Sequence, residues 1–113
     1  MQVLFNSRHS QAADLRDLTE RRVRFVLRRL GWLVPRAEVQ MSDVNGPRGG
    51  IDKHCQVELR TDGAGSVVVT SVAKDWRTAL DQALARAARL LMRLWRRSND
   101  ARRLRQRLIR DER

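Results

Sequence analysis

The stretch HCQVELRTDGAGSVVVTSVA, residues 54–73, contains the patterns of two strands and of the turn between them. Its first part alternates apolar and polar residues through Cys55, Val57 and Leu59, which is the period of a half-buried strand. TDGAG is a strong turn signal. SVVVTSVA follows as a second, β-branched strand, which we expect to be central in its sheet. The stretch therefore predicts two strands joined by a hairpin.

Two further strands are predicted before this hairpin. Residues 2–7 alternate, with Val3 and Phe5 on one face. AEVQMSDV alternates in the same way, with Val39 and Met41 facing one side. The segment NGPRGGIDKHC follows, and its residues 45–50 indicate a flexible hairpin loop. Three consecutive strands joined by hairpins predict a mainly antiparallel sheet.

Two segments have the apolar spacing of helices. In DLRDLTERRVRFVLRRLG, Asp14 is the expected N-cap and Gly31 the expected C-terminal stop. DWRTALDQALARAARLLMRLWRR predicts a longer second helix. The apolar stripe of the first helix is expected to contain Leu15, Leu18, Val23, Val26 and Leu30, and that of the second Trp76, Leu80, Ala83, Ala87, Leu91 and Leu94.

The element order β-α-β-β-β-α predicts an α+β fold. Two amphipathic helices can cover one face of a four-stranded, mainly antiparallel sheet, which gives a two-layer sandwich. A chain of 113 residues fits one domain, which we place at residues 1–97. Residues 98–113 form a basic tail that either extends the last helix or stays disordered until a partner binds.

Positive charge is the strongest global signal in the composition. The chain has 24 Lys and Arg residues against 13 Asp and Glu, a net charge of +11. Lys53 and Lys74 are the only lysines, and the guanidinium fork of arginine matches phosphate well. The excess charge lies in the two helical segments and the tail. We therefore expect a polyanionic partner, with nucleic acid as the first candidate.

The arginines of the second helix form a directional stripe. At 100° per residue, five of them fall within about one third of the circumference, and no acidic residue interrupts them. Like charges at this spacing destabilise a helix, so an external anion is the expected compensation. An ordinary solvated face and a membrane-surface helix with Trp95 at its rim remain alternatives. The stripe contains Arg86, Arg89, Arg93, Arg96 and Arg97.

The first helix carries a second set of arginines. Arg21, Arg24 and Arg28 line the side opposite its apolar face. Arg22 and Arg29 lie within or at the edge of the apolar arc. These two either extend over the rim of the core or reach a ligand around the end of the sheet.

Catalytic and metal-binding interpretations of the glycine-rich segment are weaker. A Walker loop requires a different glycine spacing and a hydroxyl residue after Lys53. Asp52, His54 and Cys55 are adjacent, so neighbours in this strand would point to opposite faces, and His9 is the only other histidine. Cys55 is in phase with the core, and we expect His54 on the open side of the sheet. We expect no catalytic residue, no metal site and no cofactor.

These segments together resemble the ribosome hibernation-promoting factor family. QVLFNSRH resembles its first strand, LRDLTERRVRFVLRRLG its first helix, AEVQMSDVNG its second strand and DWRTALDQALARAARLLMRLWRR its last helix. The resemblance covers residues 1–97 and fits the short form, which lacks the dimerisation domain of the long members. This sequence uses arginine where the family often has lysine, and its glycine-rich loop is longer.

The resemblance implies a β-α-β-β-β-α domain that binds the small ribosomal subunit. In the family, basic side chains contact 16S rRNA phosphates in the channel used by mRNA and tRNA. We therefore expect a cytoplasmic hibernation factor that binds 70S ribosomes, blocks translation sterically, and is monomeric off the ribosome. No small-molecule substrate and no membrane are expected. The positions carried over are Arg21, Arg22, Arg28, Arg29, Arg86, Arg89, Arg93, Arg96 and Arg97, and Arg48 and Lys53 add two possible contacts at the end of the sheet.

A double-stranded RNA-binding domain is the alternative binding protein. Its α-β-β-β-α core has the same order without the first strand, and the GP of NGPRGG is similar to its second RNA-binding loop. That family begins its last helix with a lysine cluster, whereas this chain has KDWRTALDQAL with two aspartates. The alternative function is binding of double-stranded or structured RNA without ribosome specificity.

Overall fold

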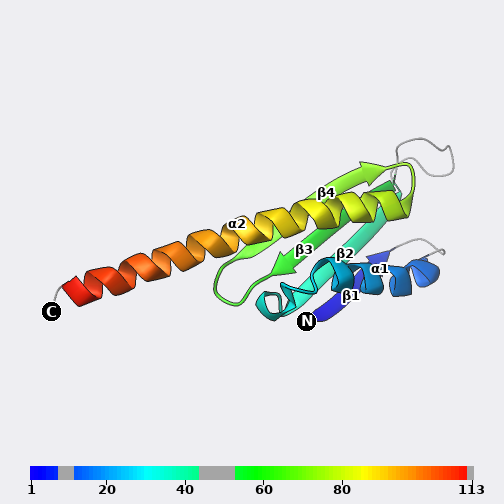
Figure 1. Ribbon diagram of the computed structural model, residues 1–113. Coiled ribbons are helices and arrows are strands. Elements are labelled where there is room, and N and C mark those ends of the chain that lie inside the picture. Colours follow the sequence, from blue (N-terminus) through cyan, green and yellow to red (C-terminus); the bar gives the residue numbers. More distant parts are fainter. Residues whose placement is uncertain (8–11, 44–52, 112–113) are drawn as a thin grey trace.

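The chain folds into one sheet and two helices, which a computed structural model describes for residues 1–7, 12–43 and 53–111. The order β-α-β-β-β-α is confirmed, with a short 3₁₀ helix added after the first α-helix (Figure 1). The elements are β1 (Gln2–Ser7), α1 (Ala12–Val26), η1 (Gly31–Leu33), β2 (Arg36–Asp43), β3 (Lys53–Arg60), β4 (Ser66–Ala73) and α2 (Trp76–Asp111).

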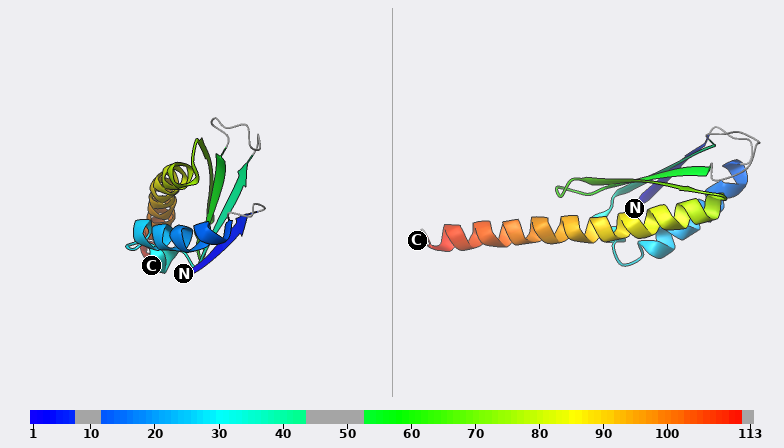
Figure 2. Two further views of the ribbon diagram at one scale, coloured as in Figure 1. Left: turned by 90° about the vertical axis from the view of Figure 1, so that its right-hand side faces the viewer. Right: turned by 90° about the horizontal axis from the view of Figure 1, so that it is seen from above.

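The four strands lie in the order β1-β2-β3-β4. β1 pairs with β2 in parallel, through a crossover that contains α1, and the other two pairs are antiparallel. The prediction of an α+β fold with a mainly antiparallel sheet is therefore confirmed. Both helices cover the same face of the sheet, α1 beside β1 and α2 across β3 and β4 (Figure 2).

The prediction that SVVVTSVA forms a central strand is wrong. β4 lies at the edge of the sheet, and β2 and β3 are the central strands. Along β4 the buried residues alternate with exposed ones, and Val68 and Val72 face the open side. A run of β-branched residues reports strand propensity, whereas the position in the sheet depends on which neighbours pair with the strand.

The core lies between the sheet and the helices, as the apolar spacing predicts. Val39, Met41, Cys55, Val57 and Leu59 are buried on the helix-facing side of β2 and β3. The sequence reasoning missed several helical members of this core. The buried residues of the two helices and of the turn after α1 are Thr19, Val23, Leu27, Ala79, Leu80, Ala83, Leu84, Ala87 and Leu91.

The two predicted ends of the first helix are both wrong. The helix begins at Ala12, so Asp14 lies inside its first turn and not at the N-cap. It ends at Val26, and a hydrogen bond from the Leu30 amide to the Leu27 carbonyl, 2.9 Å long, replaces the α-helical pattern. Gly31 then opens η1. This tighter path turns the chain back toward β2 earlier than the glycine alone predicts.

The second helix begins with a side-chain cap. The Thr78 amide donates to Oδ1 of Asp75 over 2.8 Å, and the Thr78 hydroxyl donates to Oδ2 over 2.9 Å. These bonds lower the pKa of Asp75, because both favour its charged form. Asp75 thus defines where the helix starts.

The second helix is one continuous element of 36 residues that runs beyond the sheet (Figure 1). The principal extents of the molecule are 67 × 22 × 18 Å, so the helix gives it an elongated shape. Residues 100–110 are exposed, including Leu104, Leu108 and Ile109. The helix does not break at residue 97, and residues 98–111 extend it.

The turn between β3 and β4 matches its TDGAG signal. Gly63 and Gly65 have φ angles of 93° and 98°, a region that glycine enters without steric cost. The Thr61 amide donates to the Gly65 carbonyl over 3.0 Å, and the Ala64 amide donates to the Thr61 hydroxyl over 3.1 Å. These bonds close the hairpin.

Candidate nucleic-acid interface

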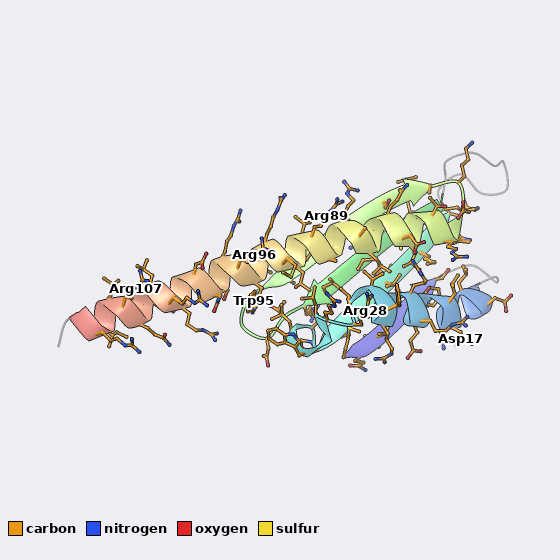
Figure 3. The ribbon with its side chains drawn as sticks, in the orientation of Figure 1. Asp17, Arg28, Arg89, Trp95, Arg96 and Arg107 are labelled. Carbon is orange, nitrogen blue, oxygen red and sulfur yellow. The ribbon has the colours of Figure 1, made fainter. Side chains whose placement is uncertain are left out.

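A row of exposed arginines follows the solvent side of α2. Arg86, Arg89, Arg93 and Arg96 recur at intervals of three and four residues, which keeps them on one side of the helix. Arg97 lies beside the row. All five predicted arginines of this helix are exposed, and their spacing on the helix places them along one surface, on which Figure 3 labels Arg89 and Arg96.

The row continues into the helical extension, which the sequence reasoning treated separately. Arg103, Arg107 and Arg110 keep the same spacing, and Asp100 occupies the one position where an acid interrupts it. The signal was present in the sequence as alternating three- and four-residue steps, with Asp100 at one of the positions. We call Arg86, Arg89, Arg93, Arg96, Arg103, Arg107 and Arg110 the arginine row.

The guanidinium groups of the arginine row form no ion pair within the described residues. Only one of its guanidinium groups has a protein partner there: Arg86 donates to the Thr70 carbonyl of β4 over 3.4 Å. The others make no ion pair or hydrogen bond in that part of the chain. The row is therefore a strip of free positive charge that is available to an anion.

Part of this charge lies beside a shallow groove between α2 and the edge of the sheet. The groove has a volume of about 290 Å³ and is lined by Ser66, Val67 and Val68 of β4. Arg93 and Arg97 line its other side, together with Leu90 and Leu94. Cationic and apolar groups thus meet at one surface.

The arginines of α1 and of the turn that follows it differ in how far hydrogen bonds already engage them. Arg21 donates from Nε to the Asp17 carbonyl, and Arg28 donates to the Phe25 carbonyl. The guanidinium of Arg28 also lies 4.5 Å from the centroid of the exposed Phe25 ring. Both bonds go to neutral carbonyls, so these arginines keep their net charge toward solvent.

Arg22 joins the two helices. Its Nε lies 3.0 Å from Oδ1 of Asp81 on α2, and the exposed fractions of the two side chains are 29% and 37%. The sequence left open whether Arg22 extends over the rim of the core or reaches a ligand around the end of the sheet. In the structure its side chain spans the interface between the two helices, where Asp81 already pairs its charge. Arg29 is exposed at the end of the turn that follows α1.

Of the two contacts predicted at the end of the sheet, Lys53 and Arg48, the structure describes only Lys53. Lys53 forms an ion pair with Asp43 and lies 5.3 Å from the centroid of the Trp76 ring. It therefore sits near the first turn of α2 and outside the arginine row. Arg48 lies outside the described residues, as do His9 and Asp52.

The candidate nucleophile is enclosed in the core. Cys55 is fully buried, and burial raises the pKa of its thiol to about 12. His54 points to the open face, where it lines a hollow with Gln40, Gln56 and Thr70. The predicted divergence of His54 and Cys55 is confirmed, so the two side chains do not form a catalytic pair.

Metal-binding clusters and membrane-spanning helices are both absent from the described residues. No group of three or more His, Cys, Asp or Glu side chains in residues 1–7, 12–43 and 53–111 could hold a metal ion. In the same residues, no helix combines the length and the apolar character that a membrane span requires.

The geometry defines a basic α+β sandwich with an extended helix. No family model matches its sequence, and no curated protein matches it significantly. Among solved structures, it is similar to the crystal structure of the N-terminal domain of Protein Y from Thermus thermophilus, with 21% sequence identity and a TM-score of 0.56. The match covers 85% of this chain and 96% of that domain. The comparison shows that the two share a fold.

Proposed function

We propose that this chain is a ribosome-associated hibernation factor. In this proposal it binds 16S rRNA in the decoding region of the small subunit and blocks mRNA and tRNA by occupying their space. Protein Y is a ribosome hibernation-promoting factor, and its N-terminal domain shares the fold of this chain. The family resemblance of the sequence supports the same assignment. The protein would act in the cytoplasm without a cofactor.

The observation that carries the proposal is the arginine row. At a rise of 1.5 Å per residue, neighbouring members lie about 5 to 6 Å apart along the helix, except across Asp100, where the gap is about 10 Å, and the whole row extends over about 36 Å. A strip of free guanidinium groups of this length suits a series of backbone phosphates better than a compact ligand. The exposed Arg21, Arg28 and Arg29 near the end of α1 add further cationic groups.

The proposed mechanism needs no chemical step. Charge-assisted contacts to phosphates would supply the affinity, and the shape of the folded rRNA would supply the specificity. Contacts to phosphates release counterions, so the affinity should fall steeply with salt. Bound protein would then exclude other ligands from the same channel.

Sedimentation on sucrose gradients tests the proposal. Purified protein is mixed with small subunits or 70S ribosomes and sedimented at low and at high salt. We expect co-sedimentation with both particles at low salt and release at high salt. Protein that remains at the top of the low-salt gradient would contradict the ribosome assignment.

Competition with plain RNA distinguishes a ribosome-specific factor from a binding protein for structured RNA in general. A ribosome-specific factor should prefer small subunits over an equal phosphate concentration of RNA duplex. Equal binding to both would favour a structured-RNA binding module without ribosome specificity.

A further inference from the structure

Trp32 is the most exposed large apolar side chain in the described part of the protein, with 71% of its surface in solvent. It lies in η1, after the turn that carries Arg28 and Arg29. Burying a tryptophan contributes more than burying most side chains, so an exposed one forgoes substantial stabilisation. Exposed aromatic surface of this kind often marks a binding site.

The ring of Trp32 is held in place without a ligand. Its Nε1 donates to the Arg29 carbonyl over 3.1 Å. Its centroid lies 6.0 Å from that of Trp95 on α2, with the ring planes at 89° in an edge-to-face contact. A fixed ring loses little conformational entropy when something stacks on it, so the exposed surface is already organised for binding.

A small hollow lies beside the two tryptophans, where η1, the β3–β4 turn and α2 meet. Its volume is about 120 Å³. Asp62 of the turn and Ser98, Asn99 and Arg102 of α2 supply its polar lining. The side chains of Asp62, Asn99 and Arg102 form no hydrogen bond or ion pair within residues 1–7, 12–43 and 53–111. The hollow therefore offers an acceptor, an amide and a cation that are free to bind.

We propose that Trp32 and this hollow bind one unstacked nucleobase of a single-stranded RNA segment. A base can stack on the indole, while Asp62 and Asn99 accept from and donate to its Watson–Crick edge. Arg29 and Arg102 supply positive charge for the flanking phosphates. The inference rests on the proposed function and deepens it, because it adds a base-binding site to a surface that otherwise contacts only the RNA backbone.

The chemistry favours a nucleobase over an apolar partner surface. A protein partner that covered Trp32 by hydrophobic contact would also have to bury a free carboxylate and a free guanidinium, which is costly without paired groups. A base carries both donors and acceptors at its edge, and its phosphate carries the opposite charge to the nearby arginines. The alternative that Trp32 only shields the end of the core is tested by the variants below.

The first measurement is tryptophan fluorescence during titration with single-stranded homo-oligoribonucleotides of A, C, G and U. Stacking of a base on Trp32 should quench the emission, and most of the quenching should be absent in Trp32→Phe, which retains Trp76 and Trp95. Quenching that persists unchanged in Trp32→Phe would overturn the inference. The four oligonucleotides also show which base the hollow prefers.

The second measurement compares variants of Trp32 in RNA affinity and in thermal stability. Trp32→Leu retains an apolar side chain but loses the flat ring, and it should weaken single-strand binding about tenfold. Trp32→Phe retains a stacking surface and should bind within about threefold of the wild type. If Trp32→Leu binds RNA as tightly as the wild type, with or without a change in Tm, the residue has a packing role only.

The two proposals fail in different ways. Binding to small subunits that is insensitive to Trp32→Leu would leave the ribosome assignment intact and contradict the base site. Quenching by single strands without any sedimentation with ribosomes would do the reverse. Asp62→Ala provides a variant that leaves both tryptophans in place, and we expect it to weaken binding of the preferred base and leave Tm close to that of the wild type.

Discussion

Thr19 has a fully buried hydroxyl with no hydrogen-bond partner among the described residues. It occupies a core position of α1, four residues before Val23, so the helix presents a polar atom to an apolar contact. An unsatisfied buried hydroxyl costs free energy, because water no longer solvates it. The periodicity of the helix predicted the place of Val23 in the core, but a threonine gives no apolar signal.

Replacing this hydroxyl by a methyl group should stabilise the protein. For Thr19→Val we expect the free energy of unfolding to increase by about 1 kcal/mol, measured by urea denaturation. The matched control is Val23→Thr, which introduces a hydroxyl one helical turn away and should lower stability by a similar amount. A loss of stability in Thr19→Val would show that the hydroxyl has a partner in solution.

Cys55 should be unreactive while the protein is folded. With its pKa raised to about 12, the thiol remains protonated at pH 8, and the core also blocks access to it. We expect a thiol reagent to label Cys55 completely in urea and to label it at least about a hundredfold more slowly in buffer. Rapid labelling of the native protein would show that the sheet opens beside β3.

At the scale of elements, sequence periodicity predicted what each segment becomes better than where it ends. The alternation of Cys55, Val57 and Leu59 identifies both the strand and its buried face, because the side-chain period of a strand is two. Position in the sheet depends on contacts between distant segments, so the edge location of β4 could not be read from its valines. The end of α1 depends on local hydrogen bonds that no single residue type signals.

In the candidate interface, too, sequence periodicity predicts some features, and contacts between distant residues determine others. The free arginines of α2 could be predicted because a helix places residues three and four apart on one side. The pairing of Arg22 with Asp81 could not, since it joins residues that are far apart in the sequence. Trp32 gave no pattern at all, because a single aromatic residue in a short connection has no period to detect.

Charge reversal within the arginine row should remove ribosome binding and spare the fold. For Arg89→Glu/Arg93→Glu we expect about a hundredfold weaker binding to small subunits at low salt, with little change in Tm. Both side chains are exposed, so the core does not depend on them.

The matched control for this double variant is Lys74→Glu/Arg77→Glu. It changes the net charge by the same amount at exposed positions around the start of α2, away from the arginine row. We expect its binding to weaken much less. Equal losses in the two variants would mean that net charge, and not the row, governs the affinity.

At the scale of the whole molecule, the helical extension makes the binding surface longer than the core. Residues beyond the sheet form helix without packing against it, and an isolated helix of this length is only marginally stable in water. Contact with a polyanion would therefore stabilise the helical conformation of the extension.

Neutralising the distal part of the row should change the salt dependence of binding more than the stability. For Arg103→Gln/Arg107→Gln/Arg110→Gln, we expect the slope of log affinity against log salt to become shallower by about 2 to 3. The Tm should remain within a few degrees of the wild type, because all three side chains are exposed. An unchanged slope, measured by titration at several salt concentrations, would place the extension outside the RNA interface.

The outer edge of β4 is a surface through which copies of the protein could associate. This strand of eight residues is rich in valine, contains no proline or lysine, and ends the sheet with backbone groups that another copy could pair with. Copies that carry a net charge of +11 repel one another, which opposes such pairing in dilute salt. The arginines would thus have a second effect besides the proposed RNA binding, because their mutual repulsion would keep an unbound excess of the protein from aggregating.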